Sequence, residues 1–505
     1  MKKESNQILL PIVLAIALAL RLSGTNHGFP FIFHPDEPAV IRTALELRFY
    51  LNPGHFDWPH LYMYLNYFIY MFFAGARNGL EFLNLKQTVS SMLPIVWNDE
   101  LIFYLVTRIL SAVLGALTVI PVYLAGRDSF GKRVGIIGAL AFALMPFHVR
   151  HSHYALIDVP MVFFAAWGMF YALKILQRRD TGDYAGAGFY TGLAASTKYH
   201  GGLVSLNVVL AHVLRTIRNK EKLLSLGSLS VITIAGVTAI IGFLMGTPYA
   251  VLDYQTFLRT DGPKGALWQF QNVGGSPLAK SIPEFFRKMV FKVSDDTGYV
   301  ILAAFFVVIG ILLYRKLVKK AHSENATLVY LVLCTLFFLF YISGFSRSRS
   351  HYYMIAYPYL AVVFAYLVSL LLSKVQKHKI FGALLFLVIF APLVLLSTKQ
   401  TFEFTNSDTR VQLYRWMTVN LTKNDTVFYN KATLSPVIEK FPNLKKKGNI
   451  RIGDVSEGFL ILAEEGSCHC FDYPVAQYQA KLKKLLEIDN SYNLGPKIQI
   501  YSYNK

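Results

Sequence analysis

The chain of 505 residues carries 50 Lys and Arg against 30 Asp and Glu, which is a formal net charge of +20 at pH 7. Hydrophobic residues make up 54% of it, aromatic residues 15%, and the mean hydropathy is +0.40. This composition predicts an integral membrane protein with many spans. The basic residues cluster in short loops between apolar runs, so they indicate membrane topology and exclude nucleic acid as a partner. Three Cys, one inside an apolar run, exclude a disulfide framework.

The first apolar run, residues 8–26, follows two lysines and is similar to a secretory signal. No convincing small-x-small cleavage site follows it, so we expect an uncleaved first span. His34, Asp36 and Glu37 come directly after it, in FHPDEPAV, where the chain leaves the membrane. Carboxylates are costly at a membrane boundary and indicate a site by default. The alternative is that the two carboxylates cap a surface helix with Pro38 in its first turn.

Further apolar runs can cross about 30 Å of hydrocarbon; they lie at 101–126, 134–150, 158–176, 228–247, 298–315, 326–344, 352–373 and 380–397. The segment 184–216 is apolar but broken by Lys198, His200, Gly201 and Gly202, so it is one long span or a hairpin. Only a hairpin puts all the basic loops on one side of the membrane. We therefore expect about eleven spans, with the N-terminus inside and the C-terminal end outside. Half-length helices that meet at a break need protein or an aqueous cavity to satisfy the freed backbone groups.

The outer side then holds a first loop of about 27–100, a loop of about 248–297 and a tail from about 399. In the first loop, 39–50 and 61–74 are predicted to be helices at the membrane interface. In the tail, Ser407-Asp408 caps a predicted helix, TVFYN, FLILAE and IQIYSY predict strands, and 475–487 predicts a second helix.

We therefore divide the chain into a transmembrane domain, 1–398, and an extracytoplasmic α/β domain, 399–505. The tail also contains Cys468-His469-Cys470, which is a metal half-site, a redox pair or neither, because a single cluster does not decide between them.

Several charged and polar groups on the outer side are not explained by the rule that places basic loops inside. They are Asp36 and Glu37; Arg150, His151, Ser152, His153, Tyr154 and Asp158; Lys198; Asp253; and Arg347, Arg349 and His351. Sugar transfer from an anionic lipid headgroup to a hydroxyl needs this mixture: a carboxylate takes the proton, and cations hold the leaving phosphate. The structural alternatives are a helix cap for Asp158, snorkelling for Lys198 and an ordinary loop for the arginines. Metal binding is an alternative for the histidines at 148–153, although their spacing is not specific.

The ordered motifs resemble the GT-C fold family of polytopic glycosyltransferases that use lipid-phosphate sugars, especially its protein O-mannosyltransferase and aminoarabinose-transferase branch. They are FHPDEPAV, FDWPHLYMYL, the stretch from RILSAV to LIDVP, GLAASTKYHG and SRSRSHYYMIAYPYLAVV, and together they cover about 30–375. The expected fold is therefore a polytopic α-helical GT-C fold with about eleven transmembrane helices, amphipathic helices in the first outer loop and a small C-terminal α/β extracytoplasmic domain.

The resemblance also implies roles. Asp36 is similar to the catalytic base of the first outer loop, with Glu37 beside it, and Asp158 to the second-loop carboxylate that shapes the sugar or acceptor site. The groups expected to face the polyprenyl phosphate are Lys198, Arg347, Arg349, His351 and Tyr352, and those expected to line the pocket are His34, His60, His153 and Tyr154. Trp58 and His60 stand where aminoarabinose transferases carry a Lys and a second Pro. That phosphate contact is therefore not carried over, and an aminoarabinose donor is disfavoured.

We expect an inverting glycosyltransferase that moves a sugar from a polyprenyl-phosphate carrier to a hydroxyl of a protein, lipid or polysaccharide, outside a prokaryotic inner or plasma membrane. No cofactor is required, although a divalent metal held by Asp36, Glu37 and Asp158 is compatible with this chemistry. The alternative is a lipid-linked-sugar flippase or other transporter, with 184–216 as its substrate site. Charges at one membrane face and the lack of an internal repeat disfavour it. A non-catalytic subunit is disfavoured by the presence of Asp36, Asp158 and Lys198.

Overall fold

The computed structural model describes residues 8–178, 180–272, 278–319, 325–345, 348–429, 431–448, 457–464 and 482–503, without the side chains of 278–281 and 431–432. The chain forms two compact units. The first consists of Met1–Leu22 and Asp36–Thr398, and the second of Ser23–Pro35 and Lys399–Lys505. The segment 23–35, which we expected to end the first span and begin the first outer loop, is therefore grouped with the C-terminal unit.

The first unit is helical. From the N-terminus to the middle of the chain its helices are α1 (Leu9–Leu22), α2 (Glu37–Glu46), α3 (Leu61–Phe82), α4 (Lys86–Met92), the 3₁₀ helix η1 (Pro94–Trp97), α5 (Ile102–Leu117), α6 (Val119–Phe130), α7 (Lys132–Ala143), α8 (Pro146–His151), α9 (Asp158–Gln177), α10 (Thr181–Thr197), the 3₁₀ helix η2 (Tyr199–Leu203), α11 (Val204–Arg218) and α12 (Leu226–Gly246). The second half adds α13 (Tyr249–Leu252), α14 (Tyr254–Phe257), α15 (Ala266–Asn272), α16 (Leu278–Lys288), the π-helix η3 (Met289–Val293), α17 (Ser294–Thr297), α18 (Tyr299–Leu317), α19 (Ala326–Ser343), α20 (Ser350–Tyr353), the 3₁₀ helix η4 (Met354–Ala356), α21 (Tyr357–Lys374) and α22 (Lys379–Thr405).

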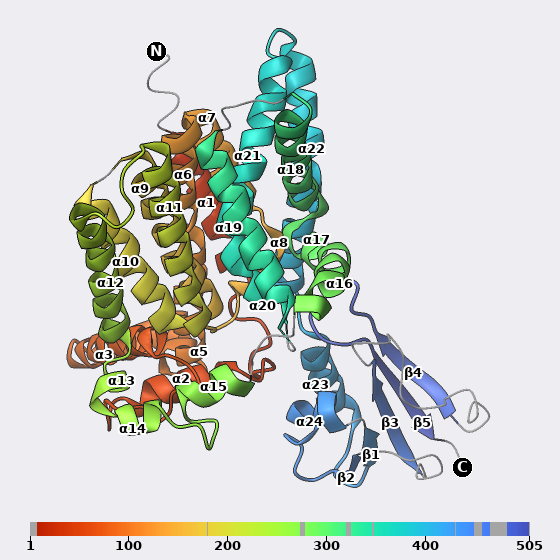
Figure 1. Ribbon diagram of the computed structural model, residues 1–505. Helices are drawn as coiled ribbons and strands as arrows, with labels where there is room; N and C mark the ends of the chain where they lie inside the picture. Colours follow the sequence, from red (N-terminus) through yellow and green to blue (C-terminus); the bar gives the residue numbers. More distant parts are fainter. Residues whose placement is uncertain are drawn as a thin grey trace. The chain divides into compact units, whose positions relative to one another are not determined.

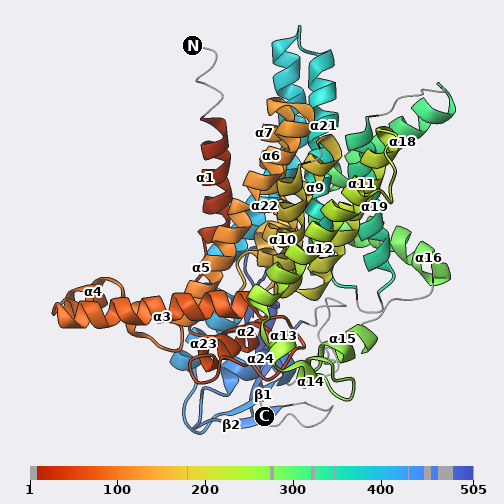
Figure 2. The same ribbon diagram turned by 60° about the vertical axis from the view of Figure 1, so that its left-hand side comes forward.

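Among the described residues, eight helical stretches are long and apolar enough to cross a membrane. They are Ile102–Phe130, Asp158–Gln177, Tyr199–Arg218, Leu226–Gly246, Tyr299–Leu317, Ala326–Ser343, Ser350–Lys374 and Lys379–Asn420, and α1 is a shorter apolar helix. The long helices of the first unit lie side by side, and α2, α3, α13, α14 and α15 gather at one end of the bundle (Figure 1). There α3 runs across the direction of the spans, as an interfacial helix does (Figure 2). The chain is an integral membrane protein, and the count of eleven spans stays a prediction.

The predicted span 134–150 is interrupted. Helix α7 ends at Ala143 and α8 starts at Pro146, with Met145 in an extended conformation between them. Proline lacks an N–H and disfavours helical geometry in the residue before it, which accounts for the break. The buried Arg21 of α1 satisfies the freed end of α7, donating to the carbonyls of Ala143 at 2.9 Å and Phe142 at 3.3 Å.

The predicted hairpin of 184–216 is present, with its break at Lys198, which is extended between α10 and η2. Its arms are longer than the half-length helices that we expected. Helix α10 has 17 residues, and η2 together with α11 spans 20. A buried polar chain ties the arms to α12: the Tyr184 hydroxyl lies 2.6 Å from Nδ1 of His212, whose Nε2 lies 2.7 Å from the Ser228 hydroxyl.

Small residues let α10 and α12 pack closely. A Cβ added to Gly188 would lie 2.0 Å from the Ala235 carbonyl oxygen, and one added to Gly192 would lie 2.1 Å from that of Ala239. Two glycines four residues apart on one helix face are the usual means of such close approach between membrane helices. This contact fixes where α10 ends, and hence where Lys198 lies.

The second unit contains a five-stranded sheet with the order β2-β1-β3-β5-β4. Its elements are α23 (Thr409–Asn420), β1 (Thr426–Tyr429), α24 (Lys431–Ile438), β2 (Lys445–Gly448), β3 (Gly458–Ala463), β4 (Leu482–Ile488) and β5 (Ile498–Tyr503). Strands β2 and β3 run parallel to β1, whereas β5 is antiparallel to β3 and β4. The small α/β domain predicted at the C-terminus is therefore confirmed, including the three strands expected from their apolar runs.

One predicted element of this unit is wrong. Of the helix expected at 475–487, the described part is strand β4, which pairs with β5. Lys483 and Lys484 are exposed on this edge strand, where lysines discourage pairing with other chains. The cluster at 468–470 lies outside the described residues.

The segment 23–35 packs into the core of this unit. The Phe31 ring meets the Tyr414 ring edge-to-face at 5.1 Å, and the Arg410 guanidinium lies 3.5 Å from the centre of the Phe33 ring. Asp408 caps α23 as predicted, accepting a 2.8 Å bond from the N–H of Arg410. Gly24 has a φ of +86°, and an added Cβ there would lie 2.6 Å from the Phe404 carbonyl, so only glycine fits.

Candidate active site

An ion pair links the start of α9 to the break of the helical hairpin. The Lys198 ammonium lies 2.5 Å from Oδ1 of Asp158, and the exposed fractions of the two side chains are 14% and 6%. The same ammonium lies 4.6 Å from the centre of the Tyr352 ring, which comes from α20. Three predicted site residues, separated by up to 194 positions in the sequence, thus meet at one point. An ammonium has three donors, so Lys198 can bind a further anion while it holds Asp158.

A cavity of about 270 Å³ opens beside this pair. Its wall is largely aromatic, with Trp58, Tyr199, Phe270, Tyr341, Phe345 and Tyr352. Its polar groups are Asp57, Lys198, His200 and Gln269. An apolar pocket with few convergent polar groups is the usual form of a small-molecule site.

The loop before α3 forms one side of this cavity. The Tyr199 hydroxyl donates a 2.7 Å bond to the Phe56 carbonyl, which anchors the loop to η2. Asp57 points one carboxylate oxygen at Nδ1 of His55, 2.5 Å away. Asp57 lies within the motif that we quoted for the family resemblance, but the motif alone did not indicate a role for it.

His60, a predicted pocket residue, is 1% exposed at the start of α3. Burial lowers the pKa of His60 to about 3, so its imidazole is neutral at physiological pH. His60 follows the lining residues Asp57, Trp58 and Pro59 in the chain. Its backbone N–H donates a 3.4 Å bond to the Thr247 hydroxyl.

Glu37 is fully buried and held by two elements. The Arg108 guanidinium of α5 donates two 2.7 Å bonds, Nε to Oε1 and Nη2 to Oε2, and the Ala155 N–H donates a third bond of 2.9 Å to Oε1. Both oxygens of Glu37 are thereby engaged. The start of α2 is consequently fixed against the loop that leads into Asp158.

Asp36 precedes Glu37 and is the residue before α2, with its side chain half-buried. The fixed position of Glu37 also limits the position of Asp36. His34 lies in the segment 23–35, which belongs to the second unit.

Two predicted residues, His153 and Tyr154, lie in the loop between α8 and α9. His153 is fully buried, with Nδ1 2.9 Å from the Val149 carbonyl oxygen. Tyr154 is half-buried, and its ring centre lies 6.1 Å from that of His151.

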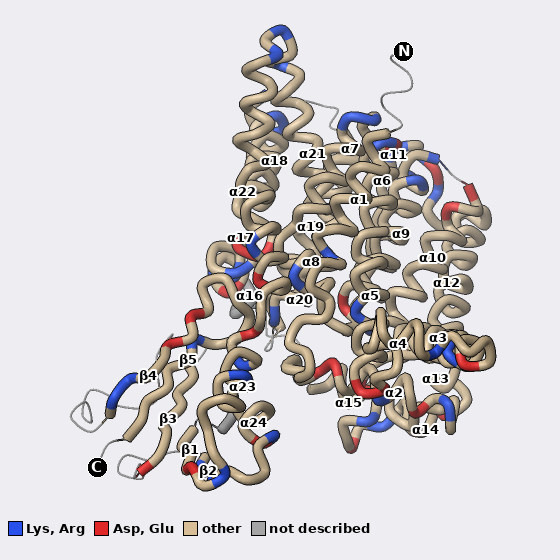
Figure 3. Tube along the Cα trace, turned by 180° about the vertical axis from the view of Figure 1, so that it is seen from behind, with Lys and Arg blue, Asp and Glu red and all other residues tan. Residues whose placement is uncertain are grey.

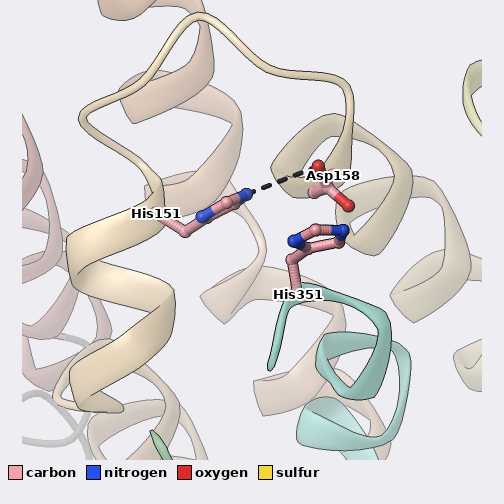
Figure 4. Close-up of side chains that lie close together, drawn as sticks. All are labelled: His151, Asp158 and His351. Carbon is pink, nitrogen blue, oxygen red and sulfur yellow. Dashed lines mark hydrogen bonds and ion pairs between the residues drawn. The ribbon is translucent and has the colours of Figure 1, made fainter. Parts of the chain in front are cut away.

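His151 and His351 flank Asp158 (Figure 4). Nε2 of His151 lies 3.4 Å from Oδ2 of Asp158, the oxygen that does not hold Lys198. The two imidazole rings stack at 5.6 Å. The predicted residue His351 thus belongs to the same cluster as Asp158 and Lys198, and His151 joins it.

Of the two predicted arginines, Arg347 lies outside the described residues, and Arg349 is exposed just before α20. The neighbouring Lys292 donates a 3.1 Å bond to the Ser348 carbonyl. Lys288 likewise donates a 2.8 Å bond to the Ser343 carbonyl. Lys288 at the end of α16 and Lys292 in η3 therefore bind the chain at Ser343 and Ser348, which the sequence alone did not indicate.

Arg108 is the clearest residue that the sequence analysis missed. The signal was present, because a lone charge inside an apolar span indicates a buried partner or a functional site. Asp57 was missed as well, since only the fold shows that it lines the cavity. His151 was among the outer polar groups singled out from the sequence, and the fold adds that it lies against Asp158.

Comparison with known proteins agrees with the resemblance. Residues 104–244, which include Arg108, Asp158 and Lys198, match the family described as dolichyl-phosphate-mannose-protein mannosyltransferase. Dolichyl-phosphate-mannose–protein mannosyltransferase 1 of Saccharomyces cerevisiae is 31% identical over 135 residues, which is 25% of this chain and 15% of the yeast protein.

The fold is shared with the oligosaccharyltransferase of Archaeoglobus fulgidus. Its apo form aligns with a TM-score of 0.51 at 14% identity, over 87% of this chain and 64% of that one. The form tethered to an acceptor peptide aligns with a TM-score of 0.52 at 14% identity, over 88% and 63%. The chain therefore spans less than two thirds of the archaeal enzyme and about one seventh of the yeast protein. The GT-C fold is confirmed, and so is the resemblance to mannosyltransferases that use lipid-phosphate sugars.

Proposed function

We propose that this protein is an inverting glycosyltransferase that moves a sugar from a polyprenyl-phosphate carrier to a hydroxyl acceptor on the extracytoplasmic side of the membrane. The observation that carries the proposal is the Asp158–Lys198 pair beside the aromatic cavity. Both residues lie in the segment that matches the mannosyltransferase family. The archaeal protein of the same fold has been solved with an inhibitory peptide and a dolichol-phosphate, which supports a lipid carrier here.

In the proposed reaction, the acceptor oxygen attacks the anomeric carbon while the bond from that carbon to the phosphate oxygen breaks. The phosphate leaves with the electron pair, and we assign Lys198, Arg347 and Arg349 to stabilise its charge. Because a phosphate leaving group needs no proton, one base is sufficient. His351 and Tyr352 border the leaving phosphate, and Asp158 positions the Lys198 ammonium.

The base is Asp36, which takes the acceptor's proton as its oxygen attacks. Glu37 is a positioning residue in this scheme, since Arg108 and the Ala155 N–H engage both of its oxygens. Asp57 faces the cavity, so we assign it to the sugar hydroxyls.

The distribution of basic residues supports the proposed location of the reaction on the extracytoplasmic side of the membrane. Lys and Arg gather where α7 begins and where α21 gives way to α22, at the end of the bundle opposite α2 and α3 (Figure 3). Basic residues favour the cytoplasmic side. We therefore place the cavity on the extracytoplasmic face of a prokaryotic inner or plasma membrane, with the N-terminus in the cytoplasm.

The test is sugar transfer in purified membranes with a panel of radiolabelled polyprenyl-phosphate sugars. Asp36→Asn should lose about 10²–10⁴-fold in turnover while it still binds the donor. Asp99→Asn is the control, since its carboxylate is exposed, pairs with Arg77 and does not line the cavity. Equal activity of the wild type and Asp36→Asn would place the base elsewhere. If no donor turns over and labelled lipid instead crosses liposomes, the protein is a transporter.

A further inference from the structure

The cluster at Asp158 has the donor set of a transition-metal site. His151 comes from the end of α8, Asp158 from the start of α9 and His351 from α20, and the three side chains point toward one another (Figure 4). One nitrogen or oxygen of each can be chosen so that all lie within 4.8 Å of one another. Two imidazole nitrogens and one carboxylate oxygen are the ligand set of a catalytic zinc with an open fourth position. Mg²⁺ and Ca²⁺ prefer oxygen ligands, so they fit this set poorly.

The distances suit such an ion with a small adjustment. Bonds of about 2.0–2.1 Å in a tetrahedron place the ligand atoms about 3.3–3.5 Å apart. His151 Nε2 and Asp158 Oδ2 are already 3.4 Å apart. One ring nitrogen of His351 lies within 4.8 Å of both atoms, so a rotation of this side chain would close the remaining gap.

The charge of Lys198 determines which ligand such an ion would favour at its open position. Its ammonium binds Oδ1 of Asp158 and leaves Oδ2 to face the imidazoles. A divalent ion on Oδ2 would share one carboxylate with the ammonium, so the site would carry an excess of positive charge. An anion at the open position removes that excess. Metal and phosphate should therefore strengthen each other's binding, because coupling between two sites is reciprocal.

We propose that His151, Asp158 and His351 bind a divalent transition-metal ion, zinc by preference, whose open position accepts an oxygen of a phosphate group beside Lys198. This inference rests on the proposed function for the identity of the phosphate, but not for the metal.

The experiment measures metal binding by the full-length protein in detergent. All variants carry Cys468→Ser and Cys470→Ser, so that this cysteine pair supplies no ligand. Stripped protein is titrated with Co²⁺, whose visible bands report tetrahedral coordination, and with Zn²⁺ in competition. The reference protein should bind one ion per chain. His151→Ala and His351→Ala should each lower the affinity at least about 100-fold, whereas His378→Ala, an exposed histidine just before α22, should not change it.

A further variant, at His351, distinguishes the loss of a metal ligand from misfolding of the protein. His351→Cys replaces one ligand with another, so it should retain Co²⁺ and add a sulfur-to-cobalt charge-transfer band. Unchanged binding in both alanine variants, or no binding by the reference protein, would overturn the inference. If that protein binds no metal but still transfers sugar, the proposed function survives without this site.

Two phosphate probes then identify the anion. Undecaprenyl phosphate should bind at least about tenfold more tightly with Zn²⁺ present, a coupling of about 1.4 kcal/mol. Inorganic phosphate should show the same coupling at lower affinity if the lipid tail adds binding. Coupling with inorganic phosphate alone would assign the site to free phosphate and overturn the lipid assignment. No coupling with either probe would overturn the phosphate part of the inference.

Discussion

Glu37 and Arg108 form a buried, bidentate ion pair between the start of α2 and helix α5. The two bonds are both 2.7 Å long, and the exposed fractions of the side chains are 0% and 1%. The residues are 71 positions apart in the sequence. The pair fixes the residue next to Asp36, while the Ala155 N–H binds the same carboxylate three residues before Asp158. Of the three predicted catalytic carboxylates, Glu37 thus anchors the segments that carry the other two, Asp36 and Asp158.

Breaking this pair should destabilise the protein. Arg108→Ala leaves a buried carboxylate without its counter-ion, which typically costs about 3–5 kcal/mol. We expect a marked fall in the thermal midpoint of the detergent-solubilised protein, measured by intrinsic fluorescence. The double variant Glu37→Gln/Arg108→Gln, which leaves no unpaired charge, should recover part of the loss. If Arg108→Ala melts like the wild type, the pair does not hold α2 in place.

The packing of α10 against α12 gives a second prediction. Gly192→Ala places a methyl group 2.1 Å from the Ala239 carbonyl oxygen, and overpacking of this kind costs about 1–3 kcal/mol. Gly236→Ala on α12 is the matched control, because no atom lies within 4 Å of its added Cβ. The control should be neutral or stabilising by up to about 1 kcal/mol. Equal thermal midpoints for the two variants would contradict the close approach of the helices.

The membrane part was predictable where a local signal exists. Long apolar runs mark spans, and a lysine with two following glycines marked the break at Lys198. The break at Met145 was missed although Pro146 was visible, because the hydropathy of the run outweighed its proline. Strand β4 was missed because its residues, LKKLLEI, carry a helix-like charge pattern, and only pairing with β5 makes it a strand.

The site was predictable only in part, because its contacts are distant in the sequence. The positions of Asp158, Lys198 and Tyr352 in family-like motifs predicted a shared site, and their side chains do meet. No local pattern pairs Glu37 with Arg108, or brings His151 against His351 across 200 positions. Such partners depend on tertiary packing, which a single sequence does not contain.

The stability should depend on pH through Asp296 in α17, before the span α18. Burial raises the pKa of Asp296 to about 6, against the opposing effects of Ser350, Lys292 and Arg150, and nearby Asp295 raises it further. Between about pH 4 and pH 6 the folded state therefore holds a proton that the unfolded state has lost, so stability falls as pH rises through this window.

Asp296→Asn removes this dependence. Its thermal midpoint relative to the wild type should rise from pH 4 to pH 6 and level off above that range. Asp99→Asn, which removes an exposed carboxylate of the first outer loop, is the control for simple loss of charge. A difference between Asp296→Asn and the wild type that is constant with pH would contradict a buried, protonated Asp296.

Asp36 and Asp57, both in the first outer loop, should differ in the kinetic effects of their substitution. Asp57 lines the cavity, and Asp36 does not. If Asp57 binds sugar hydroxyls, Asp57→Asn should raise KM for the lipid-linked donor about tenfold and leave kcat within a few-fold, since it removes binding shared by ground and transition states. Asp36→Asn should lower kcat by about 10²–10⁴-fold with little change in KM. Initial rates in proteoliposomes, over a range of donor concentrations, separate the two effects. The reverse pattern would make Asp57 the base and give Asp36 the binding role.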